Sequence, residues 1–533
     1  MSDTTAPGQR KGLLLAFLCF GVFMVYLDAT IVNVALPDIQ QDLSTDITQL
    51  QWIIDAYTLT FACLLLTSGT LGDILGRKKI FLAGLTGFTL SSVICALSHS
   101  IGVLLVGRTL QGVCGSIMIP VSLALVSAAY TAPAARAKAI GIWAGVGGIA
   151  LSTGPVLGGV LVDHYGWQSI FWVNVPVGII ATVVLARLLT ENRSPRKRRL
   201  DLVGQLLFIT AIASLAYGLI EGNSKGWTSG IILGSFAGSV VTLLLFVLWE
   251  LRHPDPMLPM SFFRSPIVVV AGIVNFLSLF GLFAAIFLLT LYLQSINRLS
   301  SIETGVRFLA LTVPIMIASF AASIVAAKVG PRLPIAIGSV LSAGGLFGLT
   351  VLEVGSGFGS YWWSLALLGV GVSFTGAPAT VALLGSVPAE QAGTASGVSN
   401  TFRQVGTVFG VALAGALLLR HLRDTMPDAL AGTDVPAQTQ AKAVALLGDG
   451  DLSRVAALPP GIRATVMEAV GPVYVDGMHL AMQIAGTGAL VGGLCALIFL
   501  KGRRPAARAE SGAAGDQGQN GLPAENETAG QHS

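Results

Sequence analysis

The chain has 533 residues, of which 53% are hydrophobic and only 11% are charged, and its formal net charge is +4. Soluble domains average about 25% charged residues, so this chain could not cover a water-exposed surface of its size. The composition excludes an ordinary soluble protein and indicates that lipid is the main solvent. The 64 glycines agree with this interpretation, because glycine is tolerated in membrane helices and lets their backbones approach closely.

Apolar runs of about 20 residues, the length that crosses a bilayer as a helix, recur along the chain. We predict fourteen membrane-spanning helices, so the expected fold is all-α and polytopic. The predicted helices cover residues 12–36, 50–70, 80–98, 101–123, 139–161, 167–189, 202–221, 230–249, 267–292, 305–327, 334–352, 360–384, 395–419 and 478–500. The first run is too long for the apolar part of a cleaved signal peptide, and we expect it to remain in the protein.

The distribution of basic residues predicts the orientation of these helices. Lys and Arg concentrate in alternate short loops, for example at 77–79 and 196–199, and the excess persists when the segment 420–476 is counted with the other side. Because cytoplasmic loops carry the excess of Lys and Arg, we expect these loops and both termini to be cytoplasmic.

Two segments are expected to lie outside the bilayer. Residues 420–476 form the longest outer segment, which we predict to be a partly ordered connector; a folded cap over an outer opening is the alternative. The tail 501–533 is rich in small and polar residues and is predicted to be disordered.

Asp28 lies inside the first apolar run, about 13 Å along the helix from Pro37 near its outer end. A carboxylate in the middle of a membrane helix costs about 2.5–3.5 kcal/mol on insertion scales, so it needs a partner inside the protein or a function. A static hydrogen-bond acceptor is one interpretation. The other, which we favour, is a group that binds and releases a proton.

The sequence GTLGDILGRKK joins the second and third predicted helices on the inner side. Gly69 and Gly76 permit close packing and a tight turn, and Asp73 stands between them at a helix end. Arg77 and Lys78 follow as anchors at the inner face. An ordinary inner loop would explain the basic residues but not the spaced glycines around an aspartate.

Arg108 lies inside the fourth predicted helix, and Gln111 and Gly112 make the neighbouring surface polar and small. An arginine at this depth needs a carboxylate, a carbonyl or a water-filled cavity, while the alternative is a side chain that reaches the interface. In the fifth predicted helix Gly154 and Gly158 recur four residues apart with a proline between them. This pattern predicts close helix packing and a bend.

These motifs resemble those of the major facilitator superfamily, in its fourteen-helix drug:proton antiporter branch. GTLGDILGRKK is similar to the superfamily's loop signature, although Ile74 stands where a basic residue is usual. Arg108, Gln111 and Gly112 resemble its fourth-helix signature, and LDATIVNVALP and ASGVSNTFRQVGTVFG resemble signatures of the fourteen-helix branch. The residues that match the antiporter signature of helix five, with Ala150 replacing one glycine, are Gly141, Gly154, Pro155, Gly158 and Gly159.

The resemblance implies two six-helix bundles, residues 12–189 and 267–500, that rock about a central cavity near the bilayer midplane. The linker 190–266 would contain two inserted helices, and residues 1–11 would form a cytoplasmic N-terminus. The bundle 267–500 includes the outer segment 420–476.

The resemblance also implies roles for single residues. Asp28 and Arg108 would handle the proton, and the helix-five motif would favour antiport. The residues that would close the cytoplasmic side are Gly69, Asp73, Gly76, Arg77 and Lys78. Candidates for the cavity lining are Asn33, Asp55, Gln111 and Arg403. Asp55, at the outer start of the second helix, is more simply interpreted as an interfacial residue.

No cofactor or metal site is predicted. The sequence contains no Gly-Lys dipeptide and therefore no P-loop for ATP, and its five cysteines and six histidines form no ligand pattern. An ion gradient is the remaining energy source. We therefore predict a proton-coupled efflux antiporter in a bacterial cytoplasmic membrane. Its expected substrates are hydrophobic or cationic organic drugs or antibiotics, and we expect a monomer that binds no nucleic acid.

Two alternatives remain open. An exporter dedicated to one endogenous metabolite would have the same motifs. A membrane enzyme or a non-transporting sensor belongs to a different class, but an enzyme would need convergent catalytic groups, and the sequence has no HExxH motif and no cluster of histidines. A sensor would need a soluble signalling domain, and no segment outside the predicted helices is long enough for one.

Overall fold

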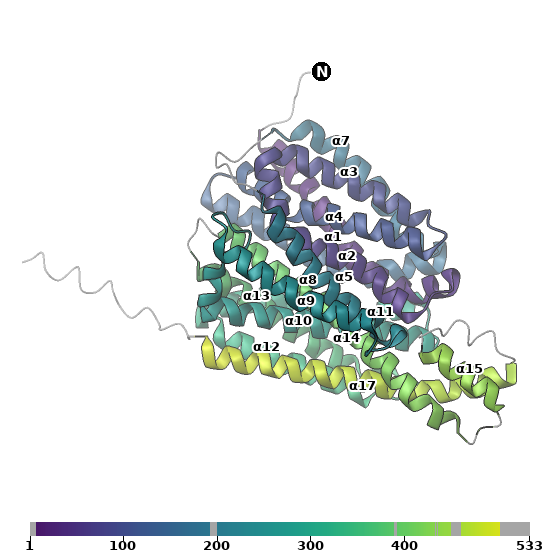
Figure 1. Ribbon diagram of the computed structural model, residues 1–533. Helices are drawn as coiled ribbons and strands as arrows, with labels where there is room; N and C mark the ends of the chain where they lie inside the picture. Colours follow the sequence, from purple (N-terminus) through teal and green to yellow (C-terminus); the bar gives the residue numbers. More distant parts are fainter. Residues whose placement is uncertain are drawn as a thin grey trace, which may run out of the picture.

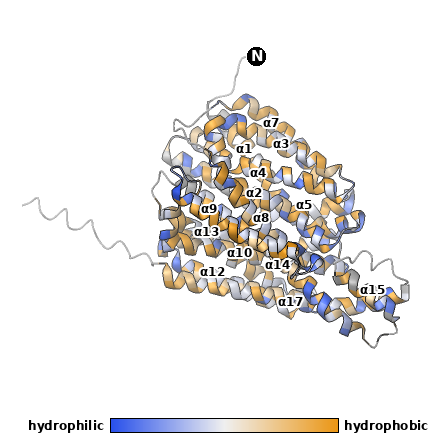
Figure 2. Cartoon of the chain, in the orientation of Figure 1, coloured by the Kyte–Doolittle hydropathy of each residue, from blue (hydrophilic) through white to orange (hydrophobic). Residues whose placement is uncertain are grey.

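The structure, a computed structural model, describes residues 7–191, 200–387, 392–431, 433, 435–448 and 460–500. It contains fourteen helices that are long and apolar enough to cross a membrane, and each corresponds to one predicted span. The described residues contain no strand. The all-α membrane architecture is therefore confirmed. Figure 2 shows the hydrophobic residues along the helices and hydrophilic residues toward their ends and around α15.

Seven helices form the N-terminal half, and the short α6 and α7 together make its sixth span. They are α1 (Pro7–Leu43), α2 (Ile47–Leu75), α3 (Arg77–Ala96), α4 (Ile101–Ala129), α5 (Pro133–Tyr165), α6 (Ser169–Trp172) and α7 (Asn174–Leu188). Local chemistry sets the ends of α2. Asp46 accepts a hydrogen bond from the Gln49 backbone N–H at 2.7 Å, and the Gln49 side chain returns to the Asp46 N–H, which satisfies two unpaired donors. Gly76 ends α2 at φ +112°, a conformation that favours glycine.

Two further helices, α8 (Leu202–Lys225) and α9 (Gly230–Arg252), form the inserted pair and pack against each other. In Figure 1 they lie across the middle of the molecule, and α8 contacts both α2 and α14. The Gln205 amide donates to the Cys63 carbonyl of α2 at 2.8 Å, and the Asn223 amide donates to the Ala416 carbonyl of α14 at 2.7 Å. The inserted pair is thus joined to both halves.

The C-terminal half contains the remaining helices. They are η1 (Met260–Arg264), α10 (Pro266–Leu291), η2 (Tyr292–Ile296), α11 (Ser301–Val329), α12 (Arg332–Gly348), η3 (Leu349–Val351), η4 (Phe358–Ser360), α13 (Trp362–Gly385), α14 (Ala392–Leu430), α15 (Ala437–Gly448) and α17 (Pro460–Phe499). Capping chemistry again marks a helix start, because Ser300 and Glu303 exchange the reciprocal hydrogen bonds of a capping box at α11.

The segment 420–476 is helical where the structure describes it. α14 continues to Leu430, α15 packs beside it, and α17 begins at Pro460, well before the predicted span. These described parts are helical and extend beyond the other helices in Figure 1, and residues 449–459 between them lie outside the described residues. The hydropathy window missed them because it detects only the portion of a helix that is apolar. The tail 501–533 lies outside the described residues.

The two halves meet where α5 packs on α11 and α2 packs on α14. Small residues permit the first contact: a Cβ on Gly159 would lie 2.4 Å from the Ser301 carbonyl oxygen, and one on Gly305 would lie 2.3 Å from the Pro155 carbonyl oxygen. Contacts this close exclude any larger side chain without a shift of the backbone. The residues Gly159 and Gly305 therefore set the distance between α5 and α11.

The ends of the helices define two faces of the molecule. The face that carries the α2–α3 and α4–α5 turns is termed the basic face, because Lys78, Arg136 and Lys138 lie there. The face that carries the α1–α2 and α3–α4 turns is termed the opposite face.

Candidate transport site

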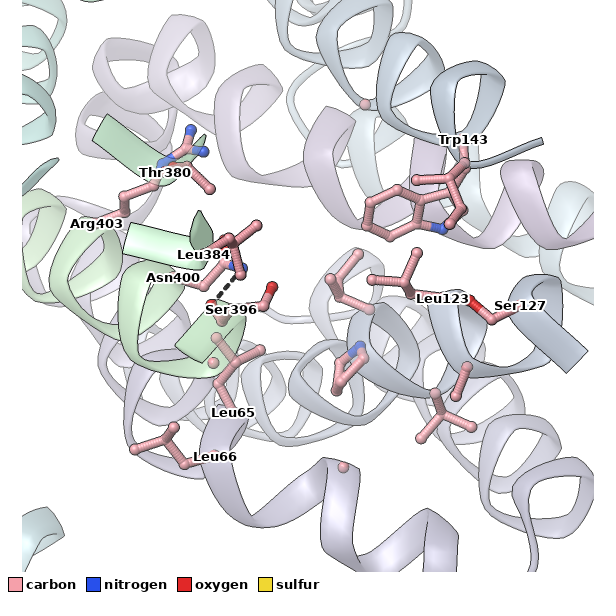
Figure 3. Close-up of a pocket in the computed structure, with 18 of the residues that line it drawn as sticks. Leu65, Leu66, Leu123, Ser127, Trp143, Thr380, Leu384, Ser396, Asn400 and Arg403 are labelled. Carbon is pink, nitrogen blue, oxygen red and sulfur yellow. Dashed lines mark hydrogen bonds between the residues drawn. The ribbon is translucent and has the colours of Figure 1, made fainter. Parts of the chain in front are cut away.

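A cavity of about 1470 Å³ lies between the two halves. Its lining includes Asp73, Arg77 and Arg136, which lie at helix ends on the basic face, so the cavity opens toward that face. Figure 3 shows the N-terminal and C-terminal halves on its two sides. The labelled lining residues from the two halves are Leu65, Leu66, Leu123, Ser127, Trp143, Thr380, Leu384, Ser396, Asn400 and Arg403.

A smaller cavity of about 100 Å³ adjoins the large one and shares Tyr26 and Arg403 with it. Its other walls are mostly apolar, with Pro155 from α5 and Phe283 and Phe308 from the C-terminal half. Apolar walls with a few polar groups are typical of sites that bind small organic molecules.

Hydrogen bonds between α2 and α14, and between α1 and the C-terminal half, join the two halves on the opposite face. The Gln51 amide donates to the carbonyls of Val411 and Ala412 at 2.9 and 3.0 Å, and the Gln294 amide donates to the Val34 carbonyl at 2.9 Å. Each of these bonds links the N-terminal half to the C-terminal half. The molecule is therefore open on the basic face and closed on the opposite face.

Two carboxylates, those of Asp163 and Asp38, also join the halves where α5 meets α11; this pair of contacts is termed the latch. The Asp163 carboxylate of α5 accepts the backbone N–H groups of Ser301 and Ile302 at 3.1 and 3.0 Å, at the first turn of α11. Asp38 of α1 accepts a hydrogen bond from the Ser301 hydroxyl at 3.1 Å. Carboxylates are stabilised at helix N-termini, where N–H groups lack partners.

Asp28 is fully buried in the N-terminal half and forms an ion pair with Arg108. Its other oxygen accepts hydrogen bonds from the amides of Gln111 at 3.1 Å and Asn174 at 3.3 Å. Gln111 also accepts a hydrogen bond from Arg108 at 3.0 Å and donates to the Ser92 hydroxyl at 2.9 Å. The structure thus brings together the two residues predicted to handle the proton.

Arg108 is only 1% exposed, so the structure excludes a side chain that reaches the interface. Its Nε donates to the Ile53 carbonyl at 3.0 Å, and its guanidinium lies 4.4 Å from the centre of the Tyr57 ring. The Tyr57 hydroxyl in turn donates to the Val25 carbonyl of α1 at 2.9 Å. A carboxylate, an amide, a carbonyl and an aromatic face together compensate this charge.

Helix α1 separates this polar cluster from the cavity. Tyr26, Ala29 and Thr30 line the cavities, whereas Asp28 lies on a different face of the same helix and lines neither. A group bound in the cavity therefore does not contact Asp28 in this state. Communication between them has to pass through the position of α1.

The loop motif forms an ion pair within the N-terminal half. Arg77 binds the Asp73 carboxylate at 2.8 Å. At the start of α3 the Glu191 carboxylate accepts the backbone N–H groups of Lys78 and Lys79 at 3.2 and 3.3 Å, and a Cβ on Gly76 would lie 2.6 Å from it. Glycine is favoured at position 76 by its φ of +112°, whereas the exposed Glu191 side chain could move aside from a Cβ. Gly69 lines the cavity.

The helix-five motif lies between α1 and α11. A Cβ on Gly154 would lie 2.0 Å from the Thr30 hydroxyl oxygen, and one on Gly158 would lie 2.9 Å from the Ile31 side chain. Gly159 and Pro155 face α11, as described above. Gly141, by contrast, has no atom within 4 Å of such a Cβ. Four of the five motif residues therefore govern close contacts, and those of Gly154 and Gly158 are with the helix that carries Asp28.

The four candidates for the cavity lining differ in their positions. Arg403 lines both cavities, but Gln111 belongs to the Asp28 cluster, and Asn33 bonds to carbonyls of its own helix at Ala29 and Thr30. Asp55 is fully buried and lines neither cavity, so the structure does not place it in the cavity lining. The reason is helix rotation: Asp55 follows Gln51 by one turn, on the stripe directed at α14.

Several residues of the site were not found from the sequence. Asn174 completes the Asp28 cluster, Gln51 bonds to α14, and Glu191 caps α3. A polar residue in an apolar run was a usable signal for Asn174 and Gln51, because such groups need partners in a membrane. Glu191 has no comparable signal, since it lies in a loop where acidic residues are common.

Comparisons with known proteins agree with this geometry. Residues 18–411 match the family model described as Major Facilitator Superfamily. The chain is similar to the tetracenomycin C resistance and export protein of Streptomyces glaucescens, with 36% identity over 513 residues that cover 94% of each chain. It is also similar to the multidrug resistance protein Stp of Mycobacterium tuberculosis, with 37% identity over 406 residues that cover 76% and 75% of the two chains.

The fold is similar to that of a bacterial homologue of the human lysosomal transporter Spinster, in an inward-facing and unoccupied conformation. The TM-score is 0.63 with 16% identity, and the match covers 92% of this chain and 98% of the other. The family model matches most of the chain, and two relatives share more than a third of their aligned residues with it. We conclude that this multi-pass membrane protein belongs to the Major Facilitator Superfamily.

Proposed function

We propose that the protein is a proton-coupled antiporter that exports hydrophobic organic compounds, drugs or antibiotics among them, across a bacterial cytoplasmic membrane. The basic face would be cytoplasmic, and the state open toward that face would then be the one that receives substrate from inside the cell. The names of its relatives, which refer to tetracenomycin C export and to multidrug resistance, support this substrate class.

The observation that carries the proposal is the arrangement of α1 between a large cavity and a buried carboxylate. The cavity supplies a place for a small organic molecule, and Asp28 supplies a group that can exist with or without a proton. A nearby cation favours the charged carboxylate, whereas desolvation favours the neutral acid. Any movement of α1 that separates Asp28 from Arg108 would therefore promote protonation, and the reverse movement would promote release.

Alternating access provides that movement in the proposal. The hydrogen bonds on the opposite face would break as the halves rotate, and the cavity on the basic face would close. Because Gly154 and Gly158 pack directly on α1, rotation at the α5–α11 contact would be transmitted to the helix that carries Asp28. Asp28 would then take up a proton on the side where the substrate is released. It would release that proton on the side where the next substrate binds.

Reconstituted protein tests the proposal. We expect proteoliposomes with an imposed pH gradient to accumulate a hydrophobic fluorescent compound, and a protonophore that collapses the gradient should stop the accumulation. Transport that continues unchanged without the gradient would contradict proton coupling. The absence of any transport across a panel of toxic compounds would contradict the export function itself.

The same panel tests an exporter dedicated to one endogenous metabolite, the alternative favoured by the single-compound name of the Streptomyces relative. Transport of many unrelated compounds would argue for a multidrug exporter, whereas transport restricted to one chemical family would argue for the dedicated one.

A further inference from the structure

Arg403 occupies an unusual position in the cavity. It lies on α14, about 16 Å along the helix from Ala392 at the basic face, and it lines both the large cavity and the smaller one behind it. Figure 3 shows it beside Thr380, on the side of the cavity formed by the C-terminal half. The residue therefore places a permanent positive charge inside the membrane region.

Among the residues that the structure describes, the guanidinium of Arg403 has no counter-ion. Within the described part of the chain it forms no ion pair, and no side-chain hydrogen bond from it is found. Tyr26 of α1, on the other half, lines the same two cavities and lies close enough for its hydroxyl to experience the charge. An arginine at this depth is costly unless water or a ligand solvates it, and the cavity provides room for either.

The remaining charged groups of the cavity do not neutralise Arg403. Asp73 is paired with Arg77, and Asp201 accepts hydrogen bonds from the Gly204 N–H and the Trp249 indole, both at the mouth on the basic face. Asp255 and Arg136 also lie at this mouth, and both are exposed there. The described residues that line the smaller cavity include no carboxylate. The deep end of the cavity thus combines one unpaired cation with apolar walls.

We propose that Arg403 binds an acidic group of the transported compound, so that the preferred substrates are amphipathic organic anions. This inference rests on the proposed export function and specifies its substrate class. A carboxylate, sulfonate or ionised phenol would accept hydrogen bonds from the planar guanidinium, which presents paired N–H donors. The apolar or aromatic body of the compound would occupy the walls formed by Phe283 and Phe308.

The same charge disfavours cations. A cationic compound at the deep end would meet Arg403 without a carboxylate to offset the repulsion in a region of low dielectric constant. The sequence analysis expected hydrophobic or cationic compounds, and this proposal replaces the cationic part of that expectation with amphipathic anions. The sequence alone could not distinguish the two, because it does not show whether an arginine in a membrane helix has a partner.

A matched pair of dyes tests this inference. Fluorescein and rhodamine 123 share a xanthene ring system, but fluorescein is an anion and rhodamine 123 a cation at neutral pH. Binding to the full-length protein in lipid nanodiscs would be measured by fluorescence anisotropy, with empty nanodiscs subtracted. We expect the wild-type protein to bind fluorescein about tenfold more tightly than rhodamine 123, since a charge-assisted hydrogen bond is worth at least that factor.

Variants of Arg403 assign the preference to this side chain. Arg403→Gln should weaken fluorescein binding about tenfold or more and leave rhodamine 123 binding equal or stronger. Arg403→Lys, which retains the charge but not the planar donors, should give an intermediate loss. Arg332→Gln is the matched control, because Arg332 is exposed at the start of α12 and lines neither cavity.

The inference is overturned if the wild-type protein binds fluorescein no more tightly than rhodamine 123, or does not bind it. It is also overturned if Arg403→Gln or Arg403→Lys weakens the binding of both dyes equally, which would indicate a structural role. The wild-type comparison remains decisive even if a variant fails to fold. Since binding needs no proton gradient, a failure of the proposed transport function would appear in the proteoliposome experiment and not in this one.

Discussion

Arg108 and Arg403 both lie within membrane-spanning helices, but their surroundings are opposite. Arg108 is buried against a carboxylate, an amide, a carbonyl and an aromatic ring, whereas Arg403 lines a cavity and has no counter-ion among the described residues. The first site is complete without a ligand. The second is not.

The difference indicates how the protein separates two tasks. In the ion pair of Asp28 and Arg108, the carboxylate can change its protonation only when the helices around it move. Arg403, whose charge is not compensated by a carboxylate among the described residues, can instead bind a ligand of opposite charge. Helix α1 lies between them, with Asp28 toward Arg108 and Tyr26 toward Arg403. Four substitutions, ordered by the size of the expected effect, would break or sharpen this comparison.

The largest effect is expected from Asp28→Asn. Asparagine can replace much of the hydrogen bonding of the aspartate but cannot take up and release a proton, so gradient-driven export in proteoliposomes should fall to background. Asp42→Asn is the matched control, because Asp42 lies on the same helix but is exposed and bonds to the Trp167 indole. Undiminished export by Asp28→Asn would remove this carboxylate from the coupling mechanism.

A smaller but still large effect is expected from Gly154→Ala. The added Cβ would lie 2.0 Å from the Thr30 hydroxyl oxygen, so α1 and α5 would have to move apart at a cost of about 1–3 kcal/mol. We expect a lower melting temperature and slower export. Gly234→Ala in α9 is the control, since its Cβ would meet no atom within 4 Å. Equal melting temperatures for both variants would contradict the close contact.

Asp163→Ala should have a moderate effect, confined to the closed face. Removal of the carboxylate frees the N–H groups of Ser301 and Ile302, so hydrogen exchange at the first turn of α11 should accelerate about tenfold. Mass spectrometry of the exchanged peptide measures this change. Asp424→Ala, which removes an exposed ion pair with Arg420, should leave that peptide unaffected. Unchanged exchange in Asp163→Ala would argue against a latch.

The smallest effect is expected from Glu191→Gln. The loss of a negative charge at the start of α3 should lower the free energy of unfolding by about 0.3–1 kcal/mol and leave export almost unchanged. Glu468→Gln on the exposed surface of α17 provides the comparison. A severe loss of export in Glu191→Gln would mean that this carboxylate takes part in gating at the basic face.

The sequence predicted the number of helices and their approximate positions because hydropathy and length are sufficient to define a membrane span. It also singled out Asp28 and Arg108, because a charge inside an apolar run demands a partner. It did not predict that Asp55 would be buried, or that α14 and α17 would each continue as one helix past the apolar run. Both depend on how each helix is rotated and on what it packs against, which a local pattern does not contain.

The same limit applies to the cavity. Whether Arg403 would pair with a carboxylate or face open space depends on the rotation of α14 against α1 and α2, and small residues distributed over several helices set that rotation. The residues that close the opposite face, such as Gln51 and Gln294, are separated in sequence from their acceptors by hundreds of positions. Single-sequence reasoning has no means to pair them.

The inserted helix α8 has a consequence for the range of motion. Near the opposite face it is fastened to α2 by the bond from the Trp52 indole to Glu221 at 2.9 Å, and to α14 by the bond from Asn223 to Ala416. These two anchor points lie about one helical turn or less apart, on helices that belong to different halves. Any rotation of the halves that separates α2 from α14 at this end must break one of these two hydrogen bonds or bend α8. The extra pair of helices would thus act as a strap that limits how far, and on which side, the transporter can open.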